Sequence, residues 1–277
     1  MKTNKNYELE HLRAIAIGLT LISHLPVLLP FHQNYLLSIF SIYMPWSGVD
    51  LFFCISGYIV SKTYLDFIDR YHKEGRFWLG ARIFWVKRLY RLLPTAWLWI
   101  LIPLLLSIIF NRSGSFGSWY DNLRSFTAVA TFSGNLANQF GMALGPNSVY
   151  WSLALEEQFY FIFPLFLLAI TNYRWRSTIL LGLIFLQFFF NRNPYGTAAS
   201  ALASSFRLDA IMWGVLIFLL SRKISFREFE PIFLRGSPLT VLTLNLFFLY
   251  LLGAIPAQLI ETPIAVGLIA VNAAILV

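Results

Sequence analysis

The sequence predicts an all-α polytopic integral membrane protein with about eight transmembrane helices (eight or nine). Of its 277 residues, 58% are hydrophobic and only 12% are charged, and the mean hydropathy is +0.65, which lies outside the range of soluble globular proteins. Aromatic residues make up 18% of the chain, as expected for the Trp- and Tyr-rich belts at membrane surfaces. Several apolar runs approach the ~20 residues with which a helix crosses a bilayer.

The expected spans are eight apolar runs, at residues 12–31, 48–65, 92–110, 149–170, 178–190, 208–220, 239–253 and 262–277. The runs at 178–190 and 208–220 are short, and their flanks at 174–176 and 198–206 can extend them. Residues 125–140 are only moderately apolar, so they either cross the membrane, re-enter it or lie on its surface.

The distribution of Lys and Arg indicates the orientation. If residues 125–140 do not cross, 17 of the 21 basic residues lie on the side of the N-terminus; if they do, the division is 13 against eight. Because basic residues favour the cytoplasmic side, we expect the first arrangement, with the N-terminus in the cytoplasm. The net charge of +8 then reflects topology and contact with anionic lipid rather than nucleic-acid binding.

The first run, residues 12–31, has Arg13 and His24 as its only ionisable groups. On a continuous helix they share a face and lie ~16 Å apart along the axis, about half of the hydrocarbon core. With Arg13 at one membrane surface, His24 lies near the midplane, where an ionisable group is expected to face the protein interior or a water-filled cavity. The alternative is a neutral histidine that hydrogen-bonds to a neighbouring helix.

The second run enters the membrane from the outer side with a carboxylate about one turn in, Asp50. Asp50 is either a functional acid or an aspartate that the helix dipole favours at a helix start. Ser56 and Gly57 follow, and such small residues let helices approach closely.

A basic cluster of Lys87, Arg88 and Arg91 comes just before the third run. Such a cluster is either an anchor on the anionic lipid surface or a clamp for a phosphorylated ligand, because the arginine fork matches phosphate oxygens. On the outer side, Glu156 and Glu157 enter the fourth run. Acidic and histidine side chains inside a membrane suggest an acid/base site or a proton relay.

The sequence predicts no metal site. The single cysteine, Cys54, excludes an intrachain disulfide and a Cys-based metal cluster. The four histidines lie on different segments; they are His11, His24, His32 and His72.

Four stretches carry a family resemblance. They are LRAIA at 12–16 followed by His24, GVDLFFCISGY at 48–58, RLYRLLP at 88–94 and WSLALEEQFY at 151–160, with a looser match in FRLDAIMWG at 206–214. In this order and approximate spacing, the chain resembles the membrane acyltransferase 3 family, polytopic enzymes that O-acylate carbohydrates of the bacterial envelope.

The resemblance implies an acyl donor, acetyl-CoA or another acyl-CoA, taken from the cytoplasm. It implies an acceptor hydroxyl on a carbohydrate or glycolipid outside the bacterial cytoplasmic (inner) membrane. His24 matches the family's catalytic histidine and Arg13 its partner, while Arg88 and Arg91 match the arginine pair that contacts the donor. His24 then acts as a general base or takes the acyl group first, and these two mechanisms stay open.

Further site residues follow from the same motifs. Glu156 matches the carboxylate of the WSL motif, and either Glu156 or Asp50 orients His24. The expected supporting residues are Ser56, Trp151, Tyr160 and Arg207.

The chain departs from the family at its end. The family usually continues through further spans, including an aromatic-rich segment with another histidine, whereas this sequence stops at Val277 inside an apolar run. We therefore expect one acyltransferase-3-like transmembrane domain over residues 1–277, incomplete at its C-terminus.

The competing function is a proton-coupled transporter or flippase that uses His24, Asp50 and Glu156 as a proton relay. Paired inverted repeats would favour it, and the sequence has no obvious internal repeat. A membrane sensor without catalytic activity has no positive support. The acceptor, the acyl chain length and the oligomeric state are not readable from the sequence.

Overall fold

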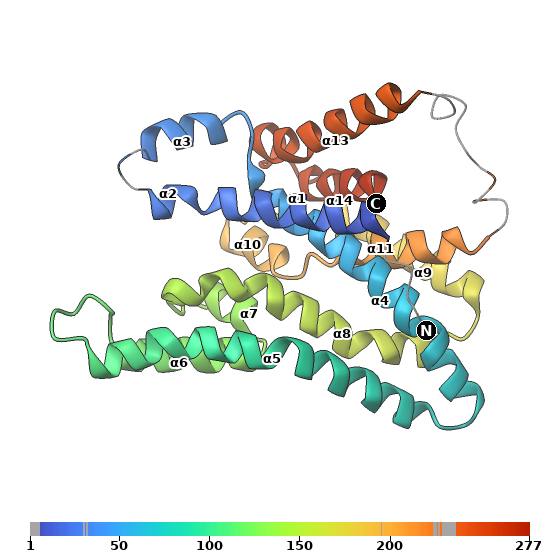
Figure 1. The fold of residues 1–277 in the computed structure, drawn as a ribbon, viewed down its shortest axis with the longest axis horizontal. Coiled ribbons are helices and arrows are strands. Elements are labelled where there is room, and N and C mark those ends of the chain that lie inside the picture. Colours follow the sequence, from blue (N-terminus) through green and yellow to red (C-terminus); the bar gives the residue numbers. More distant parts are fainter. Residues whose placement is uncertain are drawn as a thin grey trace. The chain divides into compact units, whose positions relative to one another are not determined.

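The computed structural model describes residues 6–29, 31, 33–194, 196–223, 226, 228 and 237–277. These residues form helices joined by loops, with no β-strand among them, so the predicted all-α class is confirmed (Figure 1). The chain divides into two compact units, which we describe separately. Pro30 and His32, as well as the basic residues Lys2, Lys5, Arg227 and Arg235, lie outside the described residues.

Unit 1 comprises residues 1–63, 172–193 and 207–277. Its helices are α1 (Tyr7–Ser23), α2 (Leu25–Leu28), α3 (Gln33–Phe40), the 3-10 helix η2 (Pro45–Ser47), the first part of α4 (Gly48–Lys73), α9 (Tyr173–Gln187), α11 (Asp209–Ser221), α13 (Pro238–Leu259) and α14 (Ala265–Leu276). Within this unit α14 packs on both α13 and α11, and α11 packs on α9.

Unit 2 comprises residues 64–171 and 194–206. It contains the end of α4, then α5 (Phe77–Ile109), α6 (Trp119–Ala130), α7 (Gly134–Gln139), the 3-10 helix η3 (Gly145–Tyr150), α8 (Trp151–Ala169) and α10 (Ala198–Ser204). In Figure 1, α6 runs along α5, and the two helices are in contact.

Five stretches of the described chain are long and apolar enough to cross a membrane. They are Pro45–Lys73, Phe77–Ile109, Gly145–Ala169, Ala198–Ser221 and Pro238–Leu259. The structure therefore supports a multi-pass membrane protein, with five candidate spans against the eight expected. The stretch Ala198–Ser221 joins the sixth run to residues 198–206, as expected, with α10 and α11 as separate helices within it. Helix α9 has 15 residues, and α14 is a shorter apolar helix of 12 residues.

The expected continuous span over residues 12–31 is wrong. The first helix begins earlier, at Tyr7, because the Asn6 side chain accepts hydrogen bonds from the Glu8 and Leu9 N–H groups. It ends at Ser23, and α2 starts after His24 with Pro26 in its first turn. Proline has no N–H and cannot continue a helix from the preceding residues, so the apolar run divides at His24.

Residues 125–140 do not form one helix. They comprise the end of α6, a turn at 131–133 and the short helix α7. At the turn, Phe132 has a φ of 57°, a left-handed conformation that is uncommon for a residue other than glycine. Neither helix is long enough to be a candidate span.

A proline inside α13 is compensated by a serine from another segment. Pro256 cannot donate to the carbonyl of Leu252, one turn earlier, because it has no N–H. The Ser47 hydroxyl donates to that carbonyl at 2.5 Å, and the Met44 N–H donates to the next one, Gly253, at 2.9 Å. Side chains of neighbouring segments satisfy such carbonyls in membrane proteins, so these hydrogen bonds fix η2 against α13 next to Pro256.

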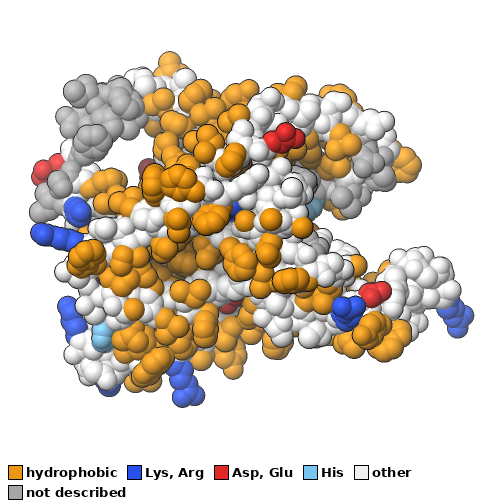
Figure 2. Space-filling view, turned by 180° about the vertical axis from the view of Figure 1, so that it is seen from behind, with side chains coloured by type: hydrophobic (Ala, Val, Ile, Leu, Met, Phe, Trp, Pro, Cys, Tyr) orange, Lys and Arg blue, Asp and Glu red, His pale blue; other side chains and the backbone are white. Residues whose placement is uncertain are grey.

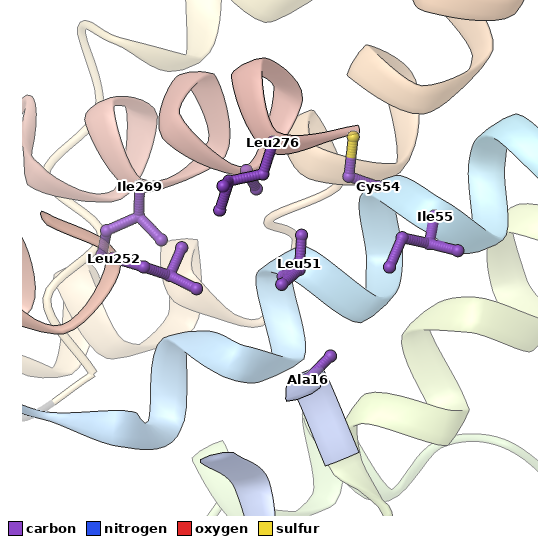
Figure 3. Packing of buried hydrophobic residues seen from close by; sticks show 8 residues of the cluster. Ala16, Leu51, Cys54, Ile55, Leu252, Ile269 and Leu276 are labelled. Atoms are coloured by element: carbon purple, nitrogen blue, oxygen red, sulfur yellow. The ribbon is translucent and has the colours of Figure 1, made fainter. Parts of the chain in front are cut away.

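One hydrophobic cluster of unit 1 contains buried residues of α1, α4, α13 and α14, most of which are labelled in Figure 3. Ala16 of α1, Leu51 and Cys54 of α4, Leu252 of α13 and Ile269 of α14 are buried together. These side chains pack together although their helices are far apart in the sequence.

Helices α4 and α11 are in close contact through two glycines. A Cβ atom on Gly57 would overlap the carbonyl of Ile211, and one on Gly214 would overlap the carbonyl of Cys54. The prediction that Gly57 lets helices approach closely is therefore confirmed.

Large apolar side chains cover much of the surface, as the orange atoms of Figure 2 show, while blue Lys and Arg side chains appear at the margins of that view. Leu98 and Trp99 of α5, for example, are 60% and 59% exposed. Such a surface suits hydrocarbon rather than water.

Candidate active site

His24 lies at the junction of α1 and α2. Its backbone caps the end of α1, and its side chain is exposed. Of the two expected surroundings, the protein interior and a water-filled cavity, the exposed side chain does not fit the first. The break in the helix leaves this imidazole accessible.

Arg13 lies near the start of the same helix and forms an ion pair. Its Nη1 donates to Oε1 of Glu10 at 3.1 Å, with 26% of the Arg13 side chain exposed. Glu10 lies one turn before Arg13, as in the i, i+3 pairs that stabilise helices. No role of Glu10 was predicted from the sequence.

Four charged side chains of unit 1 form a buried ionic cluster, which comprises Asp50, Arg192, Arg207 and Asp209. Arg192 Nη1 lies 2.9 Å from Asp209 Oδ2, and Arg207 Nη2 lies 3.6 Å from Asp50 Oδ2. The exposed fraction of each side chain is 2% or less. With two positive and two negative groups the cluster is formally neutral, which is how buried charges are tolerated.

The ionic cluster joins several segments. Asp50 lies in the first turn of α4 and Asp209 in the first turn of α11, where negative charge is favoured by the helix dipole. The guanidinium of Arg207 lies 4.6 Å from the ring centre of Trp46 in η2, a cation–π distance.

Unit 2 holds Arg88 between two tyrosine rings. The Arg88 guanidinium lies 5.3 Å from the ring centre of Tyr64 and 4.7 Å from that of Tyr160. Only 6% of Arg88 is exposed. Desolvation strengthens such cation–π contacts, so Arg88 is fixed toward α8.

The Tyr160 hydroxyl connects Arg88 to the motif glutamate. It donates a short hydrogen bond to Oε1 of Glu156, one turn earlier on α8. From the sequence, Arg88 is expected at the cytoplasmic surface and Glu156 near the outer one. In the structure α5 begins at Phe77 and η3 precedes α8, and Tyr160 contacts both Arg88 and Glu156.

The two arginines of the expected donor clamp point in different directions. Arg88 is buried against α8, whereas Arg91 is exposed, as is Lys87. Of the pair, Arg91 is therefore the one whose guanidinium is accessible to a ligand from outside the helix bundle.

Gln158, which directly follows the two glutamates, fixes the turn between α6 and α7. Its Nε2 donates to the carbonyl of Phe132 at 2.8 Å and to Oδ1 of Asn135 at 3.0 Å, and Asn135 Nδ2 donates back to Oε1 of Gln158 at 3.2 Å. Asn135 Nδ2 also donates to the carbonyl of Ser205 at 3.0 Å. This network holds Phe132 in its left-handed conformation.

The other predicted residues take supporting positions. Trp151 is the first residue of α8 and is half-buried. Ser56 is half-buried on α4, next to the Gly57 contact. In the part of the chain that the structure describes, no three His, Cys, Asp or Glu side chains are placed to hold a metal ion.

The structure brings together two sets of predicted residues. Asp50 meets Arg207 in unit 1, and Arg88, Tyr160 and Glu156 form one chain of contacts in unit 2. Arg192, Asp209 and Gln158 were not predicted. Asp209 was visible as a carboxylate at a helix start inside a quoted motif, whereas no local pattern marks Arg192 as its partner.

A model of a protein family described as "Acyltransferase domain" matches residues 6–276 of the chain. Among curated proteins, the chain is 30% identical over 142 residues to the peptidoglycan O-acetyltransferase OatA of Listeria monocytogenes. It is 35% identical over 123 residues to the O-acetyltransferase OatA of Staphylococcus aureus.

These alignments cover about half of the chain, 50% and 43%, and about a fifth of each relative, 22% and 19%. No solved structure matches.

Proposed function

Since the family model covers residues 6–276, the chain belongs to this acyltransferase family, and we propose that it is a membrane-embedded O-acyltransferase. It moves an acyl group, in the simplest case acetyl, from cytoplasmic acyl-CoA to a hydroxyl of a carbohydrate or glycolipid outside the bacterial cytoplasmic membrane. The observation that carries this proposal is the family match over nearly the whole chain. The names of two relatives, O-acetyltransferase and peptidoglycan O-acetyltransferase, support the acyl group and the acceptor class.

His24 is the proposed base. Its accessible imidazole takes the proton of the acceptor hydroxyl while the oxygen attacks the thioester carbonyl, and the departing CoA sulfur then receives a proton from the imidazolium. In the second version of the mechanism, His24 takes the acyl group first and passes it to the hydroxyl. The ion pair between Arg13 and Glu10 supports a positioning role for Arg13 on the same helix.

Two carboxylates, each held in place by another side chain, are assigned a positioning role. Asp50, held by Arg207 in the ionic cluster, and Glu156, held by the Tyr160 hydroxyl, are the two candidates that orient His24. Because His24 and Glu156 belong to different units, their grouping stays a prediction.

We assign different roles to the two arginines of the expected donor clamp, Arg88 and Arg91. Arg91 is exposed and carries five N–H donors, so we assign it to the donor phosphates. Arg88 is enclosed by Tyr64 and Tyr160, and we assign it to the alignment of Glu156 rather than to phosphate.

The test uses proteoliposomes loaded with acetyl-CoA that is labelled in the acetyl group, with peptidoglycan fragments as acceptor. We expect label on the glycan and an equal amount of free CoA. Label that crosses the membrane on an intact thioester, or glycan that stays unlabelled while CoA is not released, contradicts the proposal and favours the proton-coupled transporter.

A further inference from the structure

A cavity of about 590 Å³ lies in unit 2 between α5, α8 and the turn that joins α6 to α7. Its walls are mainly aromatic and aliphatic, with Trp85 and Leu89 from α5, Phe132 from the turn, and Phe161 and Ile162 from α8. The indole of Trp85 stacks on the ring of Phe161, with 5.4 Å between the ring centres. The volume is in the range of ligand sites, ~300–1,000 Å³.

The inner end of this cavity carries two charged groups with unused hydrogen-bonding capacity. Both Arg88 and Glu157 line it, and each is 6% exposed. Among the described residues, Oε1 of Glu157 accepts no hydrogen bond and Nε of Arg88 donates none. Buried polar atoms without partners are costly, so these atoms suit a ligand that supplies a donor to Glu157 and an acceptor to Arg88.

The charges at the inner end select against anions. Glu156 and Glu157 are neighbours on α8, and the charges of Glu156 and Arg88 both act on Glu157. An additional negative group there would meet two carboxylates and one guanidinium. A hydroxyl group avoids this repulsion, because it donates to a carboxylate and accepts from a guanidinium.

The mouth of the cavity opens where lipid is expected. The side chains of Phe161 and Ile162 are 60% and 51% exposed, and they belong to a stretch long and apolar enough to cross the membrane. Exposed apolar residues on such a helix face hydrocarbon. A ligand therefore enters the cavity from the hydrocarbon of the bilayer. Such a ligand needs an apolar chain to dissolve there.

We propose that this cavity binds an uncharged amphiphile from the bilayer, with its apolar chain against Leu89, Phe161 and Ile162 and its hydroxyl-bearing head between Glu157 and Arg88. The binding is a property of unit 2 and does not depend on acyl transfer.

The test measures binding to the detergent-purified chain by native mass spectrometry. Two lipids with identical acyl chains serve as ligands: dioleoylglycerol, with an uncharged hydroxyl head, and the anionic dioleoyl phosphatidylglycerol. We expect the wild-type chain to bind dioleoylglycerol about fivefold more tightly, because the phosphate of the second lipid is repelled by the carboxylate of Glu157.

Two variants test whether the lipids bind in this cavity. Glu157→Gln removes the negative charge and should abolish the preference, so that the two lipids bind equally. Ile162→Trp fills the mouth at an exposed position and should weaken binding of both lipids. Leu98→Ala, on an exposed part of α5 away from the cavity, is the control and should bind as the wild type does.

Equal binding of the two lipids by the wild-type chain overturns the proposal. It is also overturned if Glu157→Gln and Ile162→Trp both retain the affinity and the preference of the Leu98→Ala control.

Discussion

The indole N–H of Trp85 donates a hydrogen bond of 3.2 Å to the backbone carbonyl of Tyr160. This carbonyl lies one turn before Pro164, which has no N–H to offer it. Trp85 therefore replaces the hydrogen bond that the proline removes from α8. The same hydrogen bond ties α5 to the residue whose hydroxyl contacts Glu156 and whose ring contacts Arg88.

Substitution of Trp85 tests this replacement. We expect Trp85→Phe to lower the free energy of unfolding in detergent by about 1 kcal/mol, because the Tyr160 carbonyl loses its donor while stacking on Phe161 is kept. In a Pro164→Ala background the helix supplies its own donor, and the cost of Trp85→Phe should shrink. Equal costs in the two backgrounds would show that Trp85 acts through packing alone.

The close contact of α4 and α11 predicts that alanine is not tolerated at Gly57 or Gly214. Either Gly57→Ala or Gly214→Ala forces the helices apart and should cost about 1–3 kcal/mol of unfolding free energy. Gly182→Ala on α9 is the matched control, because a Cβ there meets nothing within 4 Å. In the control the better helix propensity of alanine should stabilise the protein by up to about 1 kcal/mol. Thermal unfolding in detergent distinguishes these outcomes, and equal melting temperatures for all three variants would refute the contact.

The buried ionic cluster predicts a strongly non-additive pair. Arg192→Met or Asp209→Leu alone leaves an uncompensated buried charge and should cost about 3–5 kcal/mol. The double variant removes both charges and should cost less than either single variant. A double-mutant cycle in chemical unfolding measures this coupling; strictly additive costs would mean that the two charges do not interact.

The different directions of Arg88 and Arg91 predict different kinetic effects. Arg91→Ala should raise KM for acyl-CoA about tenfold with little change in stability, since an exposed guanidinium loses only its ligand contact. Arg88→Ala should lower kcat and the melting temperature together, because it removes the partner of Tyr64 and Tyr160. Lys87→Ala, at another exposed basic position, is the control for general loss of charge. A larger KM effect at Arg88 than at Arg91 would reverse the assignment.

Local patterns predicted much of the fold. The all-α class, the small-residue contact at Gly57 and the extension of the sixth run all follow from composition and spacing near the residues concerned. The break at His24 was missed because apolar content was given more weight than the missing N–H of Pro26. Hydropathy alone predicted eight spans, whereas five stretches of the described chain have the length and apolar composition of a candidate span.

The arrangement of the site was harder to predict. Motif positions identified Asp50, Arg207, Arg88 and Glu156, but pairings such as Arg192 with Asp209 depend on how distant segments pack. The contact of Arg88 with Tyr160 was not predicted, because the helix that carries Arg88 starts at Phe77, well before the apolar run begins. Which residue of another helix a polar side chain contacts depends on how the two helices pack, and the local sequence does not encode that packing.

The most direct test of the account is the rate at which acetyl-CoA is cleaved in the presence of acceptor glycan, measured as free CoA thiol, for His24→Ala and His11→Ala. Both histidines belong to the N-terminal segment, and both side chains are exposed, so the pair separates catalysis from surface effects. The account predicts that His24→Ala lowers kcat by at least about a hundredfold, the scale of general acid–base catalysis, while His11→Ala stays within about twofold of the wild-type rate. Comparable rates for the two variants would contradict the role of His24.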